Sequence, residues 1–537
     1  MTDEQKLGPG EGQDTADELR KAVEARIIEE EEKHPAPSGG NGKNKIKSRF
    51  IEQCLNANEL GDGLLYAAMH RDKFFWNNTA EEWFLWKGHT WQQDIMCEHL
   101  ASVENVVDRI IEEAGEISGQ IDWAVKKGDT DSQKMLEHKR DAIYKRVSRY
   151  RTDRGRTAML KFARTCLKPL AIRGNELDLN PWLLACPNGV IDLRSGKFRD
   201  GRTDEYISKC ANIEWKGLKE PREPFEKWLV EIFEGDEKLI AFLQRVLGYA
   251  ITGLDREHIF IVFHGPEGRN GKGTLVKLLN YVLGDHAGAI PAEMLLDQGR
   301  TKSSSGPSPD ILLLKGLRIA FASETDQNRH FSPAKVKWLT GGDELVGRNL
   351  NEKNFIHFDP THTLFLLTNH LPHAPDTDSA FWERIHIIPF NLSFVRREPI
   401  KPSERRADIH LGEKLKACGS GILAWLVEGC LKYQAEGLNP PKTVTEYTAH
   451  RRSAENDLAD FFEDYCRLDD SLKEKATILY DNFNRWFKKN KSKKGITQTK
   501  FGRTMGQRFE KTKVKGVVYY LGIELVKDVE EEKEDDD

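Results

Sequence analysis

Short continuous apolar runs and longer runs with helical spacing follow one another along the chain. Between residues 103 and 111, Val and Ile recur at the spacing of a helix, and a second amphipathic helix is predicted over 224–252. The apolar runs at 259–263, 319–322 and 363–368 are bounded by glycine or polar residues, which is typical of buried strands. Strands that alternate with helices predict an α/β core in the second half of the chain.

Glycine-centred hairpins are predicted in the first half. Aromatic and β-branched residues flank Gly88, while Asn188-Gly189 and Ser195-Gly196 bracket an apolar strand. The aromatic residues around Gly88 leave two interpretations open, stacking on nucleotides or a small β core. The arginine run from Arg146 to Arg156 fits either contact with DNA phosphates or a solvated helix face.

Composition excludes several classes of protein. Of the 537 residues, 38% are hydrophobic and 31% are charged, which is typical of a soluble multidomain chain. No apolar run reaches the roughly 18–20 residues that span a bilayer, so no membrane partner is expected. The eight cysteines never form a Cys-x-x-Cys pair, which argues against a zinc ribbon or a disulfide scaffold. The acidic, polar N-terminus is not a signal peptide, so we expect a cytoplasmic protein, in a bacterial host if a phage or plasmid encodes it.

Charge is distributed unevenly about a net value of −5. Residues 481–516 hold twelve Lys or Arg and two acidic residues, a local net charge of +10. The pattern over 455–526 predicts two amphipathic helices, a basic helix opened by Lys500 and Arg503, and a β-hairpin around Gly516. This order predicts a winged helix whose third helix enters a DNA groove, although a winged helix that docks protein stays open.

The strongest chemical signal is a glycine-rich loop between an apolar strand and an amphipathic helix. Glycines let backbone N–H groups converge on phosphate oxygens, and a helix N-terminus adds positive potential. We expect Lys272 to reach the β- and γ-phosphates of ATP, and Thr274 to serve Mg²⁺ because Gly273 stands where Ser or Thr is usual. A glycine-rich loop without a ligand is the alternative. The expected cofactor-binding residues are Gly265, Gly268, Asn270, Gly271, Lys272, Gly273, Thr274 and Leu275.

Three later segments supply polar residues of the kinds that an ATPase uses. Glu324 ends an apolar strand and is expected to polarise the attacking water or to help hold Mg²⁺. Asn369 ends the next apolar strand and is expected to sense the γ-phosphate, although a turn before Pro372 is the alternative. Arg384 precedes another apolar strand and is expected to act as an arginine finger, although an ion-pairing surface arginine also fits.

Together these segments resemble the ATPase core of superfamily 3 helicases, in the poxvirus and phage/plasmid primase–helicase branch. The resemblance also rests on Leu339-Thr-Gly-Gly-Asp343, Phe381-Trp-Glu-Arg384 and Ile388-Pro-Phe390. The sequence departs from the family pattern at two positions. Gly273 stands where the family usually has Ser or Thr, and Glu383 replaces the first of two adjacent arginines. We therefore expect Arg384 to be the finger, with Arg348 as its rival.

The resemblance implies an AAA+-like fold and a DNA-contacting hairpin between the strands that end at Glu324 and Asn369. Arg348 and Lys353 fit its tip, with Lys353 following the phosphate backbone; a solvated loop is the alternative. No convincing pair of metal-binding carboxylates precedes residue 250, so we expect no priming activity in this chain.

Seven parts are expected along the chain. They are an acidic disordered tail (1–45), an α+β and helical domain (46–175), a hairpin and helical collar region (176–255), a superfamily 3 helicase ATPase domain (256–395), a helical linker or lid (396–454), a winged-helix-like domain (455–527) and an acidic tail (528–537).

The expected function is that of an ATP- and Mg²⁺-dependent DNA helicase of a phage or mobile element. It would translocate on single-stranded and forked DNA as a homo-hexameric ring during replication, with a separate primase or polymerase as a possible partner. Two alternatives stay open: a replication initiator that melts an origin, and an assembly module that binds ATP without translocation.

Overall fold

The computed structural model describes Ala25 and residues 46–298, 307–323, 329–350, 354–376, 378–455, 457–490, 495–506 and 508–529. These residues form two compact units. The first holds the residues up to Glu220 with Tyr281–His286 and Gly419–Val427, and the second holds Pro221–Asn280, Ala287–Cys418 and the residues from Glu428 on. The predicted acidic tails lie outside the described residues, apart from Ala25, Asp528 and Val529.

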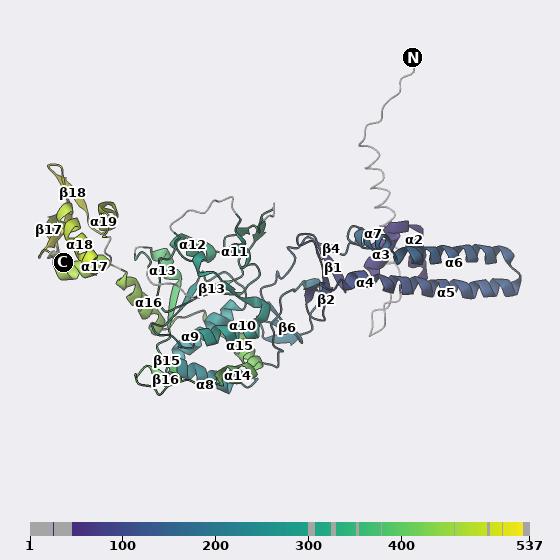
Figure 1. Cartoon of the computed structure of the whole chain (residues 1–537), viewed down its shortest axis with the longest axis horizontal. Coiled ribbons are helices and arrows are strands. Elements are labelled where there is room, and N and C mark those ends of the chain that lie inside the picture. The colour runs from purple at the N-terminus through teal and green to yellow at the C-terminus, as the bar shows by residue number, and fades with distance from the viewer. Residues whose placement is uncertain are drawn as a thin grey trace, which may run out of the picture. The chain divides into compact units, whose positions relative to one another are not determined.

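Helices dominate the N-terminal part of the first unit (Figure 1). Gly128, with φ 71°, ends α5, and the Asp129 carboxylate then accepts a hydrogen bond from the Ser132 N–H to begin α6. The two helices therefore form an antiparallel pair. The predicted apolar face over 103–111 is buried except at Ile111, which is 37% exposed. The helices are α2 (Ser48–Asn56), α3 (Asn58–His70), α4 (Glu98–Ala101), α5 (Val103–Lys127), α6 (Thr130–Tyr150) and α7 (Asp153–Ala163).

Two small sheets complete this unit, and both contain the predicted hairpins. Strands β2 and β3 pair antiparallel around Gly88, and β5, β6 and β7 form a second antiparallel sheet. Phe75, Trp83 and Trp91 are buried, so these rings belong to a small β core and are not available to stack on nucleotides. The strands are β1 (Phe74–Asn77), β2 (Glu82–Trp86), β3 (Trp91–Gln93), β4 (Ala171–Ile172), β5 (Leu183–Cys186), β6 (Gly189–Asp192) and β7 (Lys197–Arg199).

The arginine run at the end of α6 is largely used within the unit. Arg146 and Arg149 both pair with the buried carboxylate of Asp62. Arg151 and Arg156 both pair with Glu104. These four guanidiniums hold α6 and α7 against α3 and α5, which neither interpretation of the run had anticipated.

The second unit is built on a parallel five-stranded sheet, in the order β14-β8-β13-β10-β9. The interior strands β8 and β13 are fully buried, and their largely apolar sequences are typical of a parallel sheet covered on both faces. His264 at the end of β8 lies opposite both Thr368 of β13 and Pro389 of β14. The chain is thus a multidomain α/β protein, as predicted. The strands are β8 (Phe260–His264), β9 (Ala287–Ile290), β10 (Ile319–Ser323), β13 (Thr363–Thr368) and β14 (Ile385–Pro389).

Helices and four short strands surround this sheet (Figure 1). The single helix predicted over 224–252 is wrong: it is divided after Ile232, because Gly235 has φ 79° and the Asp236 carboxylate caps a new helix. The helices are α8 (Glu223–Ile232), α9 (Glu237–Ala250), α10 (Lys272–Leu283), α11 (Pro309–Leu312), α12 (Pro333–Leu339), α13 (Ser379–Arg384), α14 (Leu411–Ala417), α15 (Gly419–Glu436) and α16 (Lys442–Ala454). The short strands are β11 (Leu345–Gly347), β12 (Ile356–Phe358), β15 (Ser393–Val395) and β16 (Glu404–Arg406).

Helices α9 and α15 approach each other through glycine. A Cβ atom at Gly248 would lie 2.1 Å from the backbone nitrogen of Cys430, and one at Gly429 would lie 2.2 Å from the carbonyl oxygen of Gln244. The two backbones are therefore in direct contact, and no larger residue fits at either position without moving a helix.

The C-terminal part contains the three predicted helices and the predicted hairpin. The hairpin turns at Lys515 and Gly516, with φ values of 47° and 87°. Strand β17 was not predicted, because its exposed, charged sequence lacks apolar alternation. It completes an antiparallel sheet in the order β17-β19-β18. The elements are α17 (Asp457–Tyr465), β17 (Cys466–Lys475), α18 (Ala476–Asn490), α19 (Gln498–Met505), β18 (Lys511–Val514) and β19 (Val517–Leu525).

Candidate functional site

The glycine-rich loop lies between the end of β8 and the start of α10, as predicted. Gly271 has φ 89°, a left-handed conformation that favours glycine. At Gly265 a Cβ atom would lie 2.2 Å from Nδ2 of Asn270 and 2.5 Å from the carbonyl oxygen of Phe390. Glycine is therefore required at both ends of the loop, whereas no described atom lies within 4 Å of a Cβ built at Gly268 or Gly273.

Hydrogen bonds hold the loop in this shape. Asn270 Nδ2 donates to the carbonyl oxygen of Glu267 at 2.8 Å. From β15, Ser393 Oγ donates to the carbonyl oxygen of Gly268 at 2.9 Å, and the Phe394 N–H donates to that of Arg269 at 2.8 Å. We did not identify Ser393 from the sequence, because it lies more than a hundred residues from the loop.

Lys272 and Asn369 meet at the ends of β8 and β13. The Lys272 Nζ donates to Asn369 Oδ1 at 2.7 Å, and also to the carbonyl oxygens of Thr368 at 2.9 Å and Gly265 at 3.2 Å. Lys272 is only 6% exposed, and burial lowers its pKa to about 8. A buried amine surrounded by neutral acceptors is well placed to take an anionic ligand, which would stabilise its charged form.

Thr274 lies in the first turn of α10, one residue beyond Gly273. Its hydroxyl forms no hydrogen bond with another described residue, so it is free to hold Mg²⁺ or a water bound to the ion. The Leu275 side chain is fully buried, and its N–H donates to the carbonyl oxygen of Gly271 at 3.0 Å. Leu275 therefore anchors the start of the helix, and its expected contact with the nucleotide stays a prediction.

Substitution of Thr274 separates the two hydroxyl positions. We expect Thr274→Ala to reduce Mg²⁺-dependent ATP turnover by about 10²-fold, within the range for loss of one transition-state ligand. Gly273→Ser should be tolerated, because there is open space around Gly273. Steady-state hydrolysis measured against Mg²⁺ concentration is the assay. Full activity of Thr274→Ala would place the ion elsewhere.

Arg384 is not brought to Lys272 of its own chain. It precedes β14, whose first residue Ile385 lies opposite Phe260 at the start of β8. The strand rise places these positions roughly 13 Å from the phosphate-loop end of the sheet. The Arg384 Nη1 donates to the carbonyl oxygen of Ala380 at 2.8 Å, and Nε is buried without a partner among the described residues.

The other expected site residues are placed only in part. Strands β11 and β12 pair antiparallel and form the predicted hairpin. Arg348 follows β11, and its guanidinium lies over the ring of Phe355, 5.1 Å from the ring centroid. Glu324 and Lys353 lie outside the described residues. The backbones of Lys500 and Arg503 belong to α19, but their side chains lie outside the described part of the chain.

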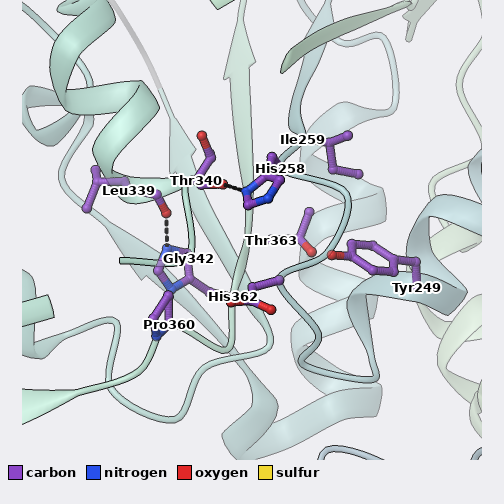
Figure 2. Close-up of a pocket in the computed structure, with 10 residues that line it drawn as sticks. Tyr249, His258, Ile259, Leu339, Thr340, Gly342, Pro360, His362 and Thr363 are labelled. Atoms are coloured by element: carbon purple, nitrogen blue, oxygen red, sulfur yellow. Dashed lines mark hydrogen bonds between the residues drawn. The ribbon is translucent and has the colours of Figure 1, made fainter. Parts of the chain in front are cut away.

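A cavity at the other end of the sheet is lined in part by the Leu339-Thr-Gly-Gly motif (Figure 2). There His258 Nδ1 donates to the carbonyl oxygen of Thr340 at 2.8 Å, and His362 Nε2 donates to that of Leu339 at 3.1 Å. His258 precedes β8 and His362 precedes β13. Through these two hydrogen bonds the motif supports the starts of both strands, whose opposite ends lead to the phosphate loop and to Asn369.

Helix α16 contributes residues that we did not identify from the sequence. His264 Nδ1 lies 2.8 Å from Tyr447 Oη, and Arg451 Nη2 lies 3.4 Å from His264 Nε2. Burial lowers the pKa of His264 to about 4, with Arg451 and Lys272 as further causes. No short motif could have revealed this contact, because 183 residues separate His264 from Tyr447.

Among the described residues, no group of three or more His, Cys, Asp or Glu side chains is arranged to hold a metal ion. No described helix is both long and apolar enough to cross a membrane.

Two family models match the chain. One, described as D5 N terminal like, matches residues 63–234, and the other, described as Poxvirus D5 protein-like, matches residues 453–531. In the sequence, the two matched segments lie before and after the residues that form the parallel sheet and the glycine-rich loop.

Similar curated proteins come from large DNA viruses. The chain is 32% identical over 328 residues to a putative helicase of Acanthamoeba polyphaga mimivirus, which covers 59% of this chain and 34% of that protein. It is 25% identical to a putative helicase of Invertebrate iridescent virus 6, with 60% and 36% covered, and 25% identical to a putative primase of African swine fever virus, with 52% and 30% covered. The chain thus spans about a third of the length of these relatives.

Among solved structures, the apo form of the NrS-1 C-terminal region is similar over 58% of this chain and 79% of that chain. The sequences are 14% identical and the TM-score is 0.38. At that score the likeness adds nothing to the fold described above.

Proposed function

The chain fits the poxvirus-like primase–helicase family, as the resemblance predicted, and from this premise we propose that it is an ATP-dependent replicative DNA helicase. ATP and Mg²⁺ bind at the loop between β8 and α10. Subunits assemble as a hexameric ring, and hydrolysis at their interfaces moves single-stranded DNA through it. Forked DNA is the substrate, and a separate primase or polymerase is a partner.

One observation supports this proposal most directly. The buried amine of Lys272 lies 2.7 Å from Asn369 Oδ1, at the ends of two neighbouring parallel strands. A loop that ends a strand and opens a helix directs backbone N–H groups at phosphate oxygens. A lysine and an amide at the same edge are then placed to bind the β- and γ-phosphates and to distinguish them from the cleaved product.

The direct test is ATP hydrolysis by the full chain with and without single-stranded DNA, together with strand displacement on a forked duplex. We expect hydrolysis to be stimulated by single-stranded DNA and the fork to be unwound. Hydrolysis without unwinding, combined with sequence-selective duplex binding, would instead indicate an initiator. Nucleotide binding without turnover would indicate an assembly module.

The C-terminal part is proposed to be a winged helix that contacts DNA phosphates. Its elements follow the order helix, strand, helix, helix and hairpin, and the net charge of residues 481–516 is +10. Lys488, Lys489 and Lys513 in this part are exposed. Phosphate contacts of this kind release counterions, so their contribution to binding is read from the salt dependence.

Neutralising these three lysines tests that proposal in the full chain. We expect Lys488→Gln, Lys489→Gln and Lys513→Gln together to reduce the magnitude of the slope of log affinity against log salt by about 2.7, with basal ATP hydrolysis unchanged. Fluorescence anisotropy with a duplex measures the slope. The control is Lys126→Gln, at an exposed position of α5. An unchanged slope would mean that this part docks protein and does not bind DNA.

A further inference from the structure

The sheet of the C-terminal part has an inner face and an outer face. Tyr520 of β19 is 2% exposed and belongs to the core that this sheet forms with α17, α18 and α19. Because successive strand residues point to opposite faces, Tyr519 and Val517 lie on the outer face. Val514 of β18 lies opposite Val517 and joins them. Val514 and Val517 are 44% and 40% exposed and Tyr519 is half-buried, so these three residues form an outer strip in contact with solvent.

Two lysines of β17 flank the outer strip. Lys475 lies directly opposite Tyr519, and Lys473, two residues earlier, lies on the same face. The Lys473 Nζ lies over the Tyr519 ring, 5.9 Å from its centroid. The intervening Glu474 is opposite Tyr520 and so belongs to the inner face. Both lysines are exposed, and neither forms an ion pair with a described residue, so their charges are not neutralised.

An aromatic ring and apolar side chains between free cations suit an unpaired nucleic-acid strand. Bases stack on the aromatic ring while the cations contact the phosphates, and a base exposes its face for this only when it leaves the duplex stack. Alternate residues of a β-strand are about 6.8 Å apart, twice the ~3.4 Å rise between stacked bases. A nucleic-acid strand that follows Val517 and Tyr519 must therefore be extended, which pairing in a duplex prevents.

We propose that the outer strip binds single-stranded DNA, with one base stacked on Tyr519 and the neighbouring phosphates on Lys473 and Lys475. The inference rests on the proposed function in taking DNA as the partner, but it does not depend on the nucleotide site. Lys513, proposed above to contact duplex phosphates, lies opposite Val518 on the other face of the hairpin. The C-terminal part then contacts the duplex and the unpaired strand through different surfaces, as a forked substrate presents them.

The stacking contact is tested by fluorescence anisotropy of the full chain with an oligothymidine and with a duplex. Tyr519→Ala should weaken binding of the oligothymidine about 5- to 100-fold, the loss of one stacked base, and change duplex affinity by less than about twofold. Tyr519→Phe keeps the ring and should remain within about twofold of the wild type. Trp123→Ala is the matched control, because Trp123 on α5 is 58% exposed and also has a cation over its ring, Lys127 at 3.8 Å.

The phosphate contacts are tested through the salt dependence. Lys473→Gln and Lys475→Gln together should reduce the magnitude of the slope of log affinity for the oligothymidine against log salt by about 1.4, because each phosphate contact on a single strand contributes ~0.7. Tyr519→Ala should leave this slope unchanged, because stacking releases no counterions. Both lysines are exposed, so this double variant remains informative even if circular dichroism shows that Tyr519→Ala unfolds. An unchanged slope in the double variant would overturn the proposal.

Photocrosslinking locates the contact within the chain. An oligothymidine that carries 5-iodouracil should crosslink to Tyr519, as identified by mass spectrometry of the digested complex. If the wild-type chain binds neither single-stranded nor duplex DNA, the proposed function itself fails. If it binds and unwinds DNA while the crosslinks fall elsewhere and Tyr519→Ala binds normally, this inference alone is overturned.

Discussion

Replacing Lys272 with alanine is expected to lower ATP hydrolysis by about 10²- to 10³-fold, the range for loss of one preorganised donor to a developing negative charge. The amine is held at the ends of β8 and β13 by three acceptors, so it is preorganised for phosphate before the ligand arrives. Steady-state hydrolysis by the full chain measures the effect. Lys277→Ala is the matched control, because Lys277 is exposed on the same helix.

The pH dependence checks that the effect is electrostatic. The free Lys272 amine has a pKa of about 8, so it carries its charge below that pH and loses it above. A bound phosphate favours the charged form and raises this pKa, so binding takes up a proton. Affinity for ATP should therefore fall as the pH rises through about 8, and Lys272→Ala should lack this dependence. Activity of Lys272→Ala equal to that of Lys277→Ala would exclude the loop as the site.

The second large effect is expected at Arg384. A finger places a fixed positive charge where the transferring phosphoryl group spreads its negative charge, and its loss typically costs about 10³-fold or more in rate. Arg384 ends α13 immediately before the start of β14, whereas Lys272 lies beyond the opposite end of β8. In its own subunit Arg384 is therefore too distant, and a role in hydrolysis requires the site of a neighbouring subunit.

Mixing experiments test this arrangement. Arg384→Ala should bind ATP but barely hydrolyse it. Mixed with Lys272→Ala subunits, it should regain part of the turnover, because some interfaces then pair an intact loop with an intact arginine. Subunit exchange is verified beforehand by fluorescence energy transfer between labelled chains. If exchange occurs and turnover is not regained, Arg384 has a structural role and Arg348 becomes the residue to test.

Local features could be predicted from the sequence. The loop over 265–274 and the hairpin at Gly516 depend on residues that are neighbours in the chain, so their spacing alone carries the information. Asn369 lies beside Lys272, because β13 pairs with β8 and brings that amide to the loop, while its expected role in sensing the γ-phosphate stays a prediction. That pairing depends on the strand order, which apolar patterning does not specify.

Contacts between distant segments could not be predicted. Ser393 supports the loop and Arg451 reaches His264 only because β15 and α16 return to the same end of the sheet. Strand β17 was missed for a different reason, since an exposed edge strand with a charged sequence carries no apolar alternation.

The division of the helix over 224–252 was signalled by Gly235 and Asp236, which are typical of a helix end and a helix start.

The glycine contact between α9 and α15 has a mechanical consequence. Gly248 and Gly429 are packed backbone to backbone, with the Gln244 side chain beside them, so the crossing point leaves no free space for a displacement. Close-packed interiors have low compressibility and transmit strain. A displacement of α9 at this point is therefore expected to move residues 428–436 of α15 with it.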